Sequence, residues 1–237
     1  MITLALDTSE ARGSVAVLRA GGVVSCPRHS DQSDYSDWLL PAVEQALAEA
    51  NTKIEQVQLL AVSTGPGSFT GLRVGLTTVK AWAEVYGKPV VGVSRLEALA
   101  RSVETAMPFV ASCYDAQRGQ LFGGLYRGSG ICRVKLGDEL VATPEEFVRM
   151  VDGDAASECV FWISLDPQMI RDLELLRKRV GSGDSLLPAP PVLAPAIAKI
   201  AEERASAGCF SDPLRLDANY VRRSDAEIFW KGSTSVR

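Results

Sequence analysis

The sequence predicts an α/β protein built from two lobes of related plan. Short segments rich in Val, Leu and Ala alternate with longer helical patterns, as in sheets covered by helices. An apolar strand ending in an aspartate, a polar turn and a second strand occur twice, over residues 2–18 and 109–126. The 237 residues are enough for two lobes of ordinary size. We expect one lobe over residues 1–105, a second over 106–222 and a loose tail over 223–237.

Composition and charge restrict the classes of function. No apolar segment reaches membrane-spanning length, and the N-terminus lacks the basic stretch of a signal peptide, so we expect a cytoplasmic protein. The net charge of −4 disfavours a phosphate-binding surface of the chain's own, so a partner would have to hold any nucleic acid. The five cysteines are odd in number and never two residues apart, which favours reduced thiols over disulfides or a zinc site.

The first lobe is predicted to begin with a β-hairpin and to continue with alternating helices and strands. Asp7 ends the first strand of the hairpin. Ser94 is placed to cap the last helix, because a hydroxyl there accepts a hydrogen bond from a free helical N–H. The elements expected after the hairpin are a strand and loop at 26–37, a helix through Leu39, Val43, Leu47 and Ala50, a strand at 57–62, a helix to Tyr86, a strand at 90–93 and a helix at 96–103.

The junction between the strand at 57–62 and the next helix is rich in glycine. It reads Gly65-Pro66-Gly67-Ser68-Phe69-Thr70-Gly71-Leu72-Arg73-Val74-Gly75, with four glycines in eleven residues. The glycines permit positive φ, and the free N–H groups of a helix start can hold an anion. The spacing matches neither the dinucleotide fingerprint nor a Walker loop. The junction is therefore either an anion site or a tight turn that lets the helix pack close to its strand.

The helix that follows this junction has two faces without charge. One face suits contact with a sheet, and the other begins with residues small enough to admit a second helix. The sheet face consists of Leu72, Leu76, Val79 and Ala83, and the other face, called the glycine seam below, consists of Gly71, Gly75, Thr78 and Trp82. Either this chain covers both faces or the glycine seam docks a partner subunit, and the pattern alone leaves both open.

The second lobe starts with the repeated hairpin, in which Asp115 holds the position that Asp7 has in the first lobe. Thr143-Pro144-Glu145-Glu146 predicts a helix start, with a capping hydroxyl, a proline in the first turn and acids at the positive end of the dipole. The later elements expected are a strand at 159–163, an amphipathic helix at 168–180, a loop at 181–191 and a helix at 194–207.

Few residues can support bond-making chemistry. His29 is the only histidine, so a catalytic triad could form only through it, a metal site with two histidines is excluded, and no serine lies in a nucleophile elbow. Asp7 and Asp115 could face each other across a cleft between the lobes and hold magnesium and phosphate. The alternative is two turn aspartates that bond to their own backbone.

Four segments together resemble the TsaB (YeaZ) family, a subunit of the bacterial machinery that forms threonylcarbamoyladenosine in tRNA. They are Asp7-Thr8-Ser9, the string 65–75, Asp115-Ala116-Gln117-Arg118 and Asn219-Tyr220-Val221-Arg222, in the family's order. The resemblance implies an α/β, two-lobed actin-like and Hsp70-like ATPase (ASKHA) fold with duplicated ribonuclease-H-like lobes. It also implies a subunit that is not an enzyme by itself. The related TsaD carries its metal on a His-x-x-x-His helix, and the equivalent segment here, residues 35–41, has no histidine.

The resemblance also implies partners. The family's TsaB binds a TsaD-like catalytic subunit, or forms a homodimer when alone, through two helices that are here about 37–50 and 70–86. The partner-interface residues implied are Leu39, Val43, Gly71, Arg73, Gly75, Thr78 and Trp82. A TsaE-like ATPase is the third component, tRNA is reached only through the complex, and ATP with Mg is held only in the assembled complex. Nucleotide or anion binding, if this chain has any, falls to Asp7, Thr8, Ser9 and Asp115, and no catalytic or metal-ligating residue is implied.

Three departures from the family's pattern are present. Residues 163–167 replace Gly-Asp-Gly, Gln117 replaces the arginine of Asp-Ala-Arg, and Ala218 replaces the proline of Pro-x-Tyr. We expect them to alter the second lobe more than assembly. The alternative function is an ATP-dependent small-molecule kinase or ATPase of the same fold, which would use Asp7 and Asp115 around magnesium.

Overall fold

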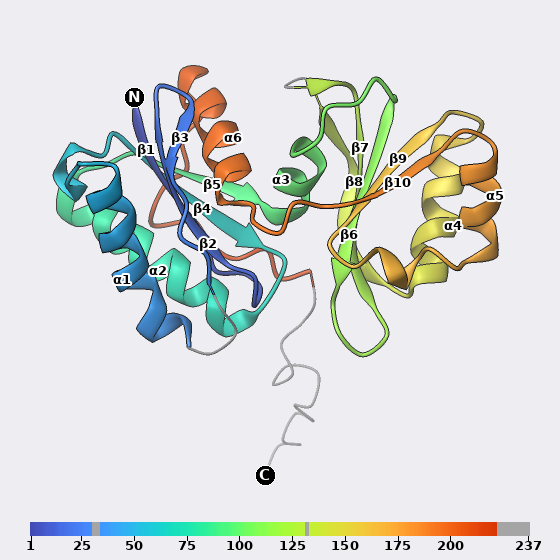
Figure 1. Ribbon diagram of the computed structural model, residues 1–237, viewed down its shortest axis with the longest axis horizontal. Helices are drawn as coiled ribbons and strands as arrows, with labels where there is room; N and C mark the ends of the chain where they lie inside the picture. The colour runs from blue at the N-terminus through green and yellow to red at the C-terminus, as the bar shows by residue number, and fades with distance from the viewer. Residues whose placement is uncertain (30–33, 131–132, 222–237) are drawn as a thin grey trace, which may run out of the picture.

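Two five-stranded sheets lie side by side in the computed structural model, which describes residues 1–29, 34–130 and 133–221 (Figure 1). The first sheet has the order β3-β2-β1-β4-β5 and the second the order β8-β7-β6-β9-β10. In each sheet the first three strands are antiparallel and the last three are parallel. The two lobes therefore share one topology, which confirms the predicted α/β fold of two related lobes.

The strands of the first sheet are β1 (Ile2–Asp7), β2 (Ser14–Arg19), β3 (Gly22–Ser25), β4 (Leu59–Gly65) and β5 (Val90–Ser94). Those of the second are β6 (Phe109–Asp115), β7 (Leu121–Arg127), β8 (Val134–Ala142), β9 (Val160–Ser164) and β10 (Ser185–Pro188). The helices are α1 (Tyr35–Glu49), α2 (Phe69–Tyr86), α3 (Arg95–Arg101), α4 (Pro144–Ala155), α5 (Glu174–Gly181) and α6 (Ala194–Ser206), with 3-10 turns at Ile54–Gln56 and Pro167–Met169.

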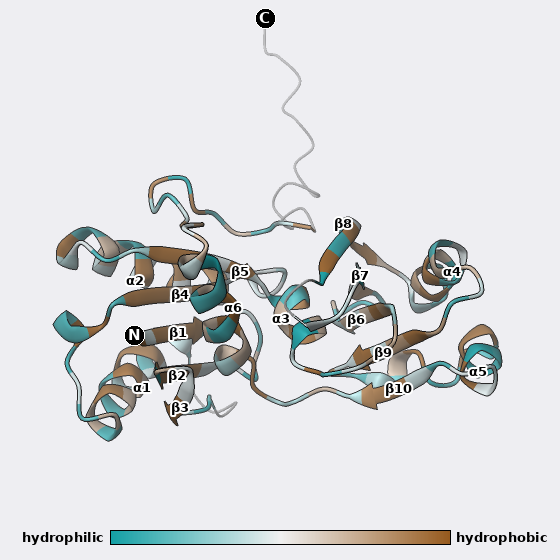
Figure 2. Ribbon diagram, turned by 90° about the horizontal axis from the view of Figure 1, so that it is seen from above, coloured by the Kyte–Doolittle hydropathy of each residue, from teal (hydrophilic) through white to brown (hydrophobic). Residues whose placement is uncertain are grey.

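The outer faces of both sheets are covered by helices of their own lobe. α1 and α2 pack on the first sheet, and α4 and α5 lie on the outer face of the second (Figure 1). Seen from above, the strands are mostly hydrophobic, whereas α5 presents hydrophilic residues outward (Figure 2). None of the helices in the described ranges is long and apolar enough to cross a membrane.

The last helix of each lobe packs on the other lobe. α3 follows β5 but contacts β6 and β7, whereas α6 follows β10 but contacts β1 and β4. The two helices also contact each other between the sheets. The division expected at residues 105 and 106 stays a prediction, and in the structure α3 and α6 each contact the sheet of the other lobe.

One buried apolar cluster joins the lobes. It draws on both sheets and on α3 and α6, with Ala5, Leu59, Val93, Leu96, Val110, Phe122, Ile163 and Ile197 among its members. Two further clusters lie beneath α1 and α2 and beneath α4 and α5. Because burial of apolar surface is the main stabilising contribution to folding, the shared cluster holds the two sheets in a fixed relation.

Several predicted elements shift in the structure. The third strand is Gly22–Ser25, earlier than the expected 26–37, and the helix expected at 168–180 is a 3-10 turn followed by α5. Apolar spacing does not separate those two conformations, since both bring residues three apart to one side. The edge strands β8 and β10 were not predicted, because β8 is polar and β10 is short and ends in a proline. The tail expected at 223–237 lies outside the described residues.

Candidate functional site

A fully buried ion pair lies at the end of β1, where the two lobes meet. Asp7 is the last residue of β1 and Arg95 the first residue of α3, and neither side chain has any exposed surface. Arg95 Nε lies 3.2 Å from Asp7 Oδ2. Asp7 Oδ1 accepts hydrogen bonds from the backbone N–H and the hydroxyl of Ser9. The carboxylate is therefore fully engaged by groups of the chain itself.

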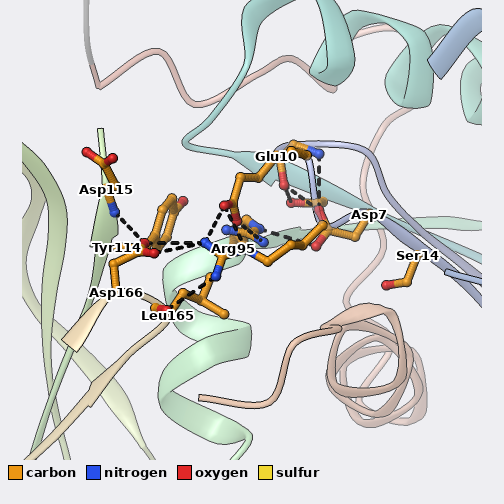
Figure 3. Close-up of polar contacts among 12 residues, drawn as sticks. Asp7, Glu10, Ser14, Arg95, Tyr114, Asp115, Leu165 and Asp166 are labelled. Atoms are coloured by element: carbon orange, nitrogen blue, oxygen red, sulfur yellow. Dashed lines mark hydrogen bonds and ion pairs between the residues drawn. The ribbon is translucent and has the colours of Figure 1, made fainter. Parts of the chain in front are cut away.

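The pair continues into a row of alternating charges that reaches the second lobe (Figure 3). Glu10 Oε2 lies 2.8 Å from Arg95 Nη2, and Glu10 Oε1 accepts from Arg12. Arg12 then lies 3.2 Å from Asp166 and donates to the Leu165 carbonyl at 3.2 Å. We call Asp7, Arg95, Glu10, Arg12 and Asp166 the ionic ladder. It connects the β1–β2 turn of the first lobe to the end of β9.

Arg95 is the centre of this ladder. Its guanidinium carbon lies 4.7 Å from the centre of the Tyr114 ring. Burial alone lowers the pKa of Arg95, but Asp7, Tyr114 and Glu10 outweigh it and raise that pKa above its ordinary value. Its Nη1 and Nη2 have no well-aligned hydrogen-bond acceptor, so the contact with Glu10 is ionic. Burial also raises the pKa of Tyr114, whose neutral hydroxyl donates to the Pro66 carbonyl at 2.7 Å.

A cavity of about 660 Å³ opens beside the ladder, between the β1–β2 turn, the start of α2 and the end of β6. Its lining includes Ser9 and Glu10 from the first turn, Ser68 and Phe69 from the glycine junction, and Asp115 from the second hairpin. The sequence analysis raised a cleft between Asp7 and Asp115 as one of two possibilities, and the cavity lies between the two hairpins with the glycine junction as a further wall. Its chemistry is different from the predicted one.

Magnesium and phosphate do not fit this arrangement. Asp7 is already paired with Arg95, and Arg95 and Tyr114 lie between Asp7 and Asp115 in Figure 3. The backbone N–H of Asp115 donates to Asp166, and its carboxylate accepts from Gln117, as in an ordinary turn. In the ranges that the structure describes, no group of three or more His, Cys, Asp or Glu is placed to hold a metal ion. The alternative of an ATPase that uses Asp7 and Asp115 therefore has no geometric support.

Comparison with known proteins decides the family. The family described as TsaD: tRNA N6-adenosine threonylcarbamoyltransferase matches residues 9–161. The chain is 28% identical over 235 residues to the tRNA threonylcarbamoyladenosine biosynthesis protein TsaB of Bacillus subtilis. The alignment covers 97% of this chain and 98% of that protein. The solved structure of YeaZ from Pseudomonas aeruginosa is 27% identical in sequence and superposes on this chain with a TM-score of 0.76. The superposition covers 92% of this chain and 99% of the YeaZ chain. The chain belongs to the TsaB (YeaZ) family.

A more distant likeness shows the wider fold. A ROK hexokinase from Thermus thermophilus superposes with a TM-score of 0.51 over 85% of this chain and 98% of its own, at 13% identity. This TsaB-family chain therefore has the two-lobed ASKHA fold that its repeated sheets and exchanged helices indicate.

The first positions of the glycine seam face the interior of this TsaB-family chain. A Cβ on Gly71 would lie 2.1 Å from the Thr8 carbonyl oxygen, and a Cβ on Gly75 would lie 2.4 Å from Thr8 Oγ1. The Thr8 hydroxyl donates to the Gly71 carbonyl at 2.7 Å. These glycines let α2 pack directly on the turn after β1. Of the two alternatives left open above, the chain itself covers this part of the seam.

The other expected interface residues divide into two groups. Leu39 and Val43 are buried in the cluster beneath α1 and α2, so they support these helices from within. Arg73 is exposed and lies 3.8 Å from the centre of the Phe69 ring, while Thr78 and Trp82 are half-buried. Only this second group can contribute atoms to an interface between folded subunits.

His29 and the described cysteines are not members of the ionic ladder. The His29 ring stacks on Tyr35 with centroids 4.3 Å apart, and its Nδ1 lies 2.8 Å from the Ala11 carbonyl oxygen. Cys26, Cys113, Cys159 and Cys209 are free thiols, and Cys132 lies outside the described residues. The expectation that the thiols are reduced stays a prediction.

The sequence analysis missed four members of the ladder. Arg95, Glu10, Arg12 and Asp166 were not singled out, since each stands in a segment assigned to a turn or a cap. One signal was available for Arg95. It opens the pattern Arg-Leu-Glu-Ala-Leu-Ala, a helix so apolar that a charge in its first turn must pair with something.

Proposed function

We propose that this TsaB-family chain is a non-catalytic subunit of the machinery that forms threonylcarbamoyladenosine in tRNA. It acts as a scaffold and activator of a TsaD-like catalytic subunit and works with a TsaE-like ATPase. The chain takes part in tRNA modification through that complex, needs no cofactor of its own, and pairs with a second copy of itself when alone. The buried Asp7–Arg95 pair carries the proposal, because the carboxylate that chemistry in the cleft would use is bonded to groups of the chain itself and does not line the cavity.

The cleft supports a role without catalysis. A carboxylate that activates a nucleophile or holds a metal must offer a free lone pair to the reacting group. Asp7 is fully buried, and its two oxygens already accept hydrogen bonds from Ser9 and Arg95, so no lone pair of this carboxylate is presented to the cavity. The fixed guanidinium of Arg95 therefore supports a structural role for Asp7.

The outer sides of α1 and α2 support a partner-binding role. Leu40 on α1 is 52% exposed and Val85 on α2 is 73% exposed. Trp38 and Trp82 lie half-buried on the same two helices and pack at the edge of the core. Large exposed apolar side chains beside aromatic rings are typical of protein interfaces. The interface expected on these helices therefore shifts from the buried glycines to their outward residues.

The test uses the full chain and its TsaD-like partner from the same organism. In Leu40→Glu with Val85→Glu, two charges replace apolar contacts, so we expect at least a tenfold loss of co-purified partner and a matching loss of tRNA modification in the reconstituted reaction. The matched control is Val180→Glu with Leu187→Glu, two exposed apolar residues of the second lobe. Unchanged partner yield and activity in the first variant, or an equal loss in the control, refutes the proposal.

A further inference from the structure

The cavity between the lobes has a partly aromatic lining. Tyr35, Phe69, Tyr114, Phe122 and Tyr220 all contribute to its wall. Phe69 and Tyr220 are in contact, with ring centroids 5.3 Å apart, yet remain 39% and 41% exposed. Partly exposed rings such as Phe69 and Tyr220, at a cavity of about 660 Å³, are suited to receive another large apolar side chain.

The same cavity also carries carboxylates. Asp34 and Asp115 line it, and neither forms an ion pair with a described residue. Glu10 lines it too but belongs to the ladder, and Arg118 adds one positive charge to the wall. The occupant that fits is therefore apolar and aromatic, with basic residues beside it.

The described part of the chain ends at this cavity. Tyr220 lines its wall, and the described residues stop at Val221. The 16 residues from 222 to 237 contain one apolar run, Ile228-Phe229-Trp230. They also hold four basic residues (Arg222, Arg223, Lys231, Arg237) against two acidic ones (Asp225, Glu227), so their net charge is +2.

Chain length permits this run to reach the cavity. Phe229 stands eight positions after Val221, and an extended chain spans up to roughly 27 Å over that separation. Since Tyr220 is itself at the wall, the segment has to turn back only a short way. Being tethered also gives it a high effective concentration at the cavity.

We propose that Ile228-Phe229-Trp230 binds in the interlobe cavity of its own chain, with Phe229 and Trp230 against the aromatic wall and Arg222, Arg223 and Lys231 near Asp34 and Asp115. The cleft of this ASKHA fold then holds a segment of the protein itself as its ligand. A partner or small molecule that enters the cavity must first displace this segment. The inference does not depend on the proposed role in tRNA modification.

Hydrogen exchange on the full chain tests the docking. In Phe229→Ala with Trp230→Ala, we expect backbone amides at 9–11, 67–69 and 115–118 to exchange several-fold faster than in the wild type. Amides of α4 and α5, away from the cavity, are the internal reference. The matched control variant is Ser233→Ala with Ser235→Ala, which changes the same tail outside the apolar run. Equal exchange in the wild type and the double aromatic variant overturns the proposal.

A second measurement follows Trp230 directly. The difference in fluorescence between the wild type and Trp230→Phe isolates Trp230 from the other three tryptophans. We expect acrylamide to quench this difference signal several-fold less than free tryptophan, and Arg222→Glu with Arg223→Glu to restore quenching. Quenching equal to that of free tryptophan overturns the proposal. Protection that disappears on tenfold dilution overturns it in favour of docking into a second copy.

Discussion

The two lobes have the same sheet topology but differ at the aspartate that ends the first strand of each hairpin. In the first lobe Asp7 is fully buried and paired with Arg95. In the second lobe Asp115 is half-exposed at the cavity and bonds to the turn that follows it. One duplicated position therefore holds a structural charge in one lobe and an open carboxylate in the other. The repeat predicts where an aspartate stands, and its neighbours decide what the aspartate can do.

The helices outside the two sheets differ in a related way. α1 and α2 have 15 and 18 residues and expose Leu40 and Val85, whereas α4 and α5 have 12 and 8 residues. The second lobe holds its short helices with a charge cluster of its own. There Asp184 accepts hydrogen bonds from the Val160 N–H at 2.9 Å and Trp162 Nε1 at 2.7 Å, and pairs with Arg179. The first lobe therefore has the longer outer helices, and the second lobe has short helices held by a charge cluster.

The largest expected effect comes from removing the buried cation of the first lobe. Arg95→Met leaves the Asp7 carboxylate buried without a counter-charge, so we expect the free energy of unfolding to fall by about 3–5 kcal/mol. Asp115→Asn, at the duplicated position, should change it by less than about 0.5 kcal/mol. Urea unfolding of both variants measures the contrast.

The double variant Asp7→Asn with Arg95→Met shows whether the stability loss in Arg95→Met comes from the unpaired charge or from lost packing. If the loss is electrostatic, removing both charges recovers most of the stability, because no unpaired charge stays buried. A loss below about 1 kcal/mol in Arg95→Met alone would contradict the structural role of the ladder.

Replacing two helix glycines by alanine should change the free energy of unfolding in opposite directions. Gly71→Ala in α2 places a methyl group 2.1 Å from the Thr8 carbonyl oxygen, so we expect a loss of about 1–3 kcal/mol as the helix shifts. Gly153→Ala in α4 meets no atom within 4 Å, so the better helix propensity of alanine should add about 0.5–1 kcal/mol. Thermal unfolding of the two variants distinguishes them. Equal shifts would mean that α2 does not pack on the turn after β1.

Local patterns predicted most of this fold correctly. The repeated hairpins, the glycine junction and the Thr143 cap depend on residues near one another in the sequence, and each lies where the pattern placed it. Such local patterns do not predict which residues far apart in the sequence come into contact. Arg95 and Asp7 are 88 residues apart, and only the crossing of α3 to the second sheet brings them together. The edge strands were missed for other reasons, because β8 is polar without apolar alternation and β10 is short and ends in a proline.

The contact made by the glycine seam could not be predicted from the sequence for the same reason. Small residues at helical spacing indicate a close approach, but they do not say by what. The contact is Thr8, which lies in the turn after β1 and comes to α2 through the parallel pairing of β1 with β4. Exposure of Leu40 and Val85 could not be read from the sequence either, because both continue the apolar pattern of their helices.

The smallest expected changes in stability come from removing the side chains that cap the first turns of α2 and α4. Hydrogen bonds from the Thr143 N–H at 2.9 Å and the Thr143 hydroxyl at 2.8 Å lower the pKa of Glu146 from its ordinary value of 4.5. A lowered pKa contributes stability that is present above the ordinary value and is lost as the pH falls through the folded value. At neutral pH Thr143→Ala should cost about 1 kcal/mol and raise the pKa of Glu146 toward 4.5.

Ser68 supplies the comparison for this capping box. It accepts from the Gly71 N–H at 3.3 Å, but the first turn of α2 has no acidic residue. Ser68→Ala should therefore lower stability by a similar amount at pH 7 and pH 3, whereas the loss in Thr143→Ala should shrink at pH 3 as Glu146 is protonated in both proteins. Urea unfolding at the two pH values and an NMR titration of Glu146 measure this difference. A pKa of Glu146 that does not move in Thr143→Ala would show that the two residues do not form the reciprocal cap.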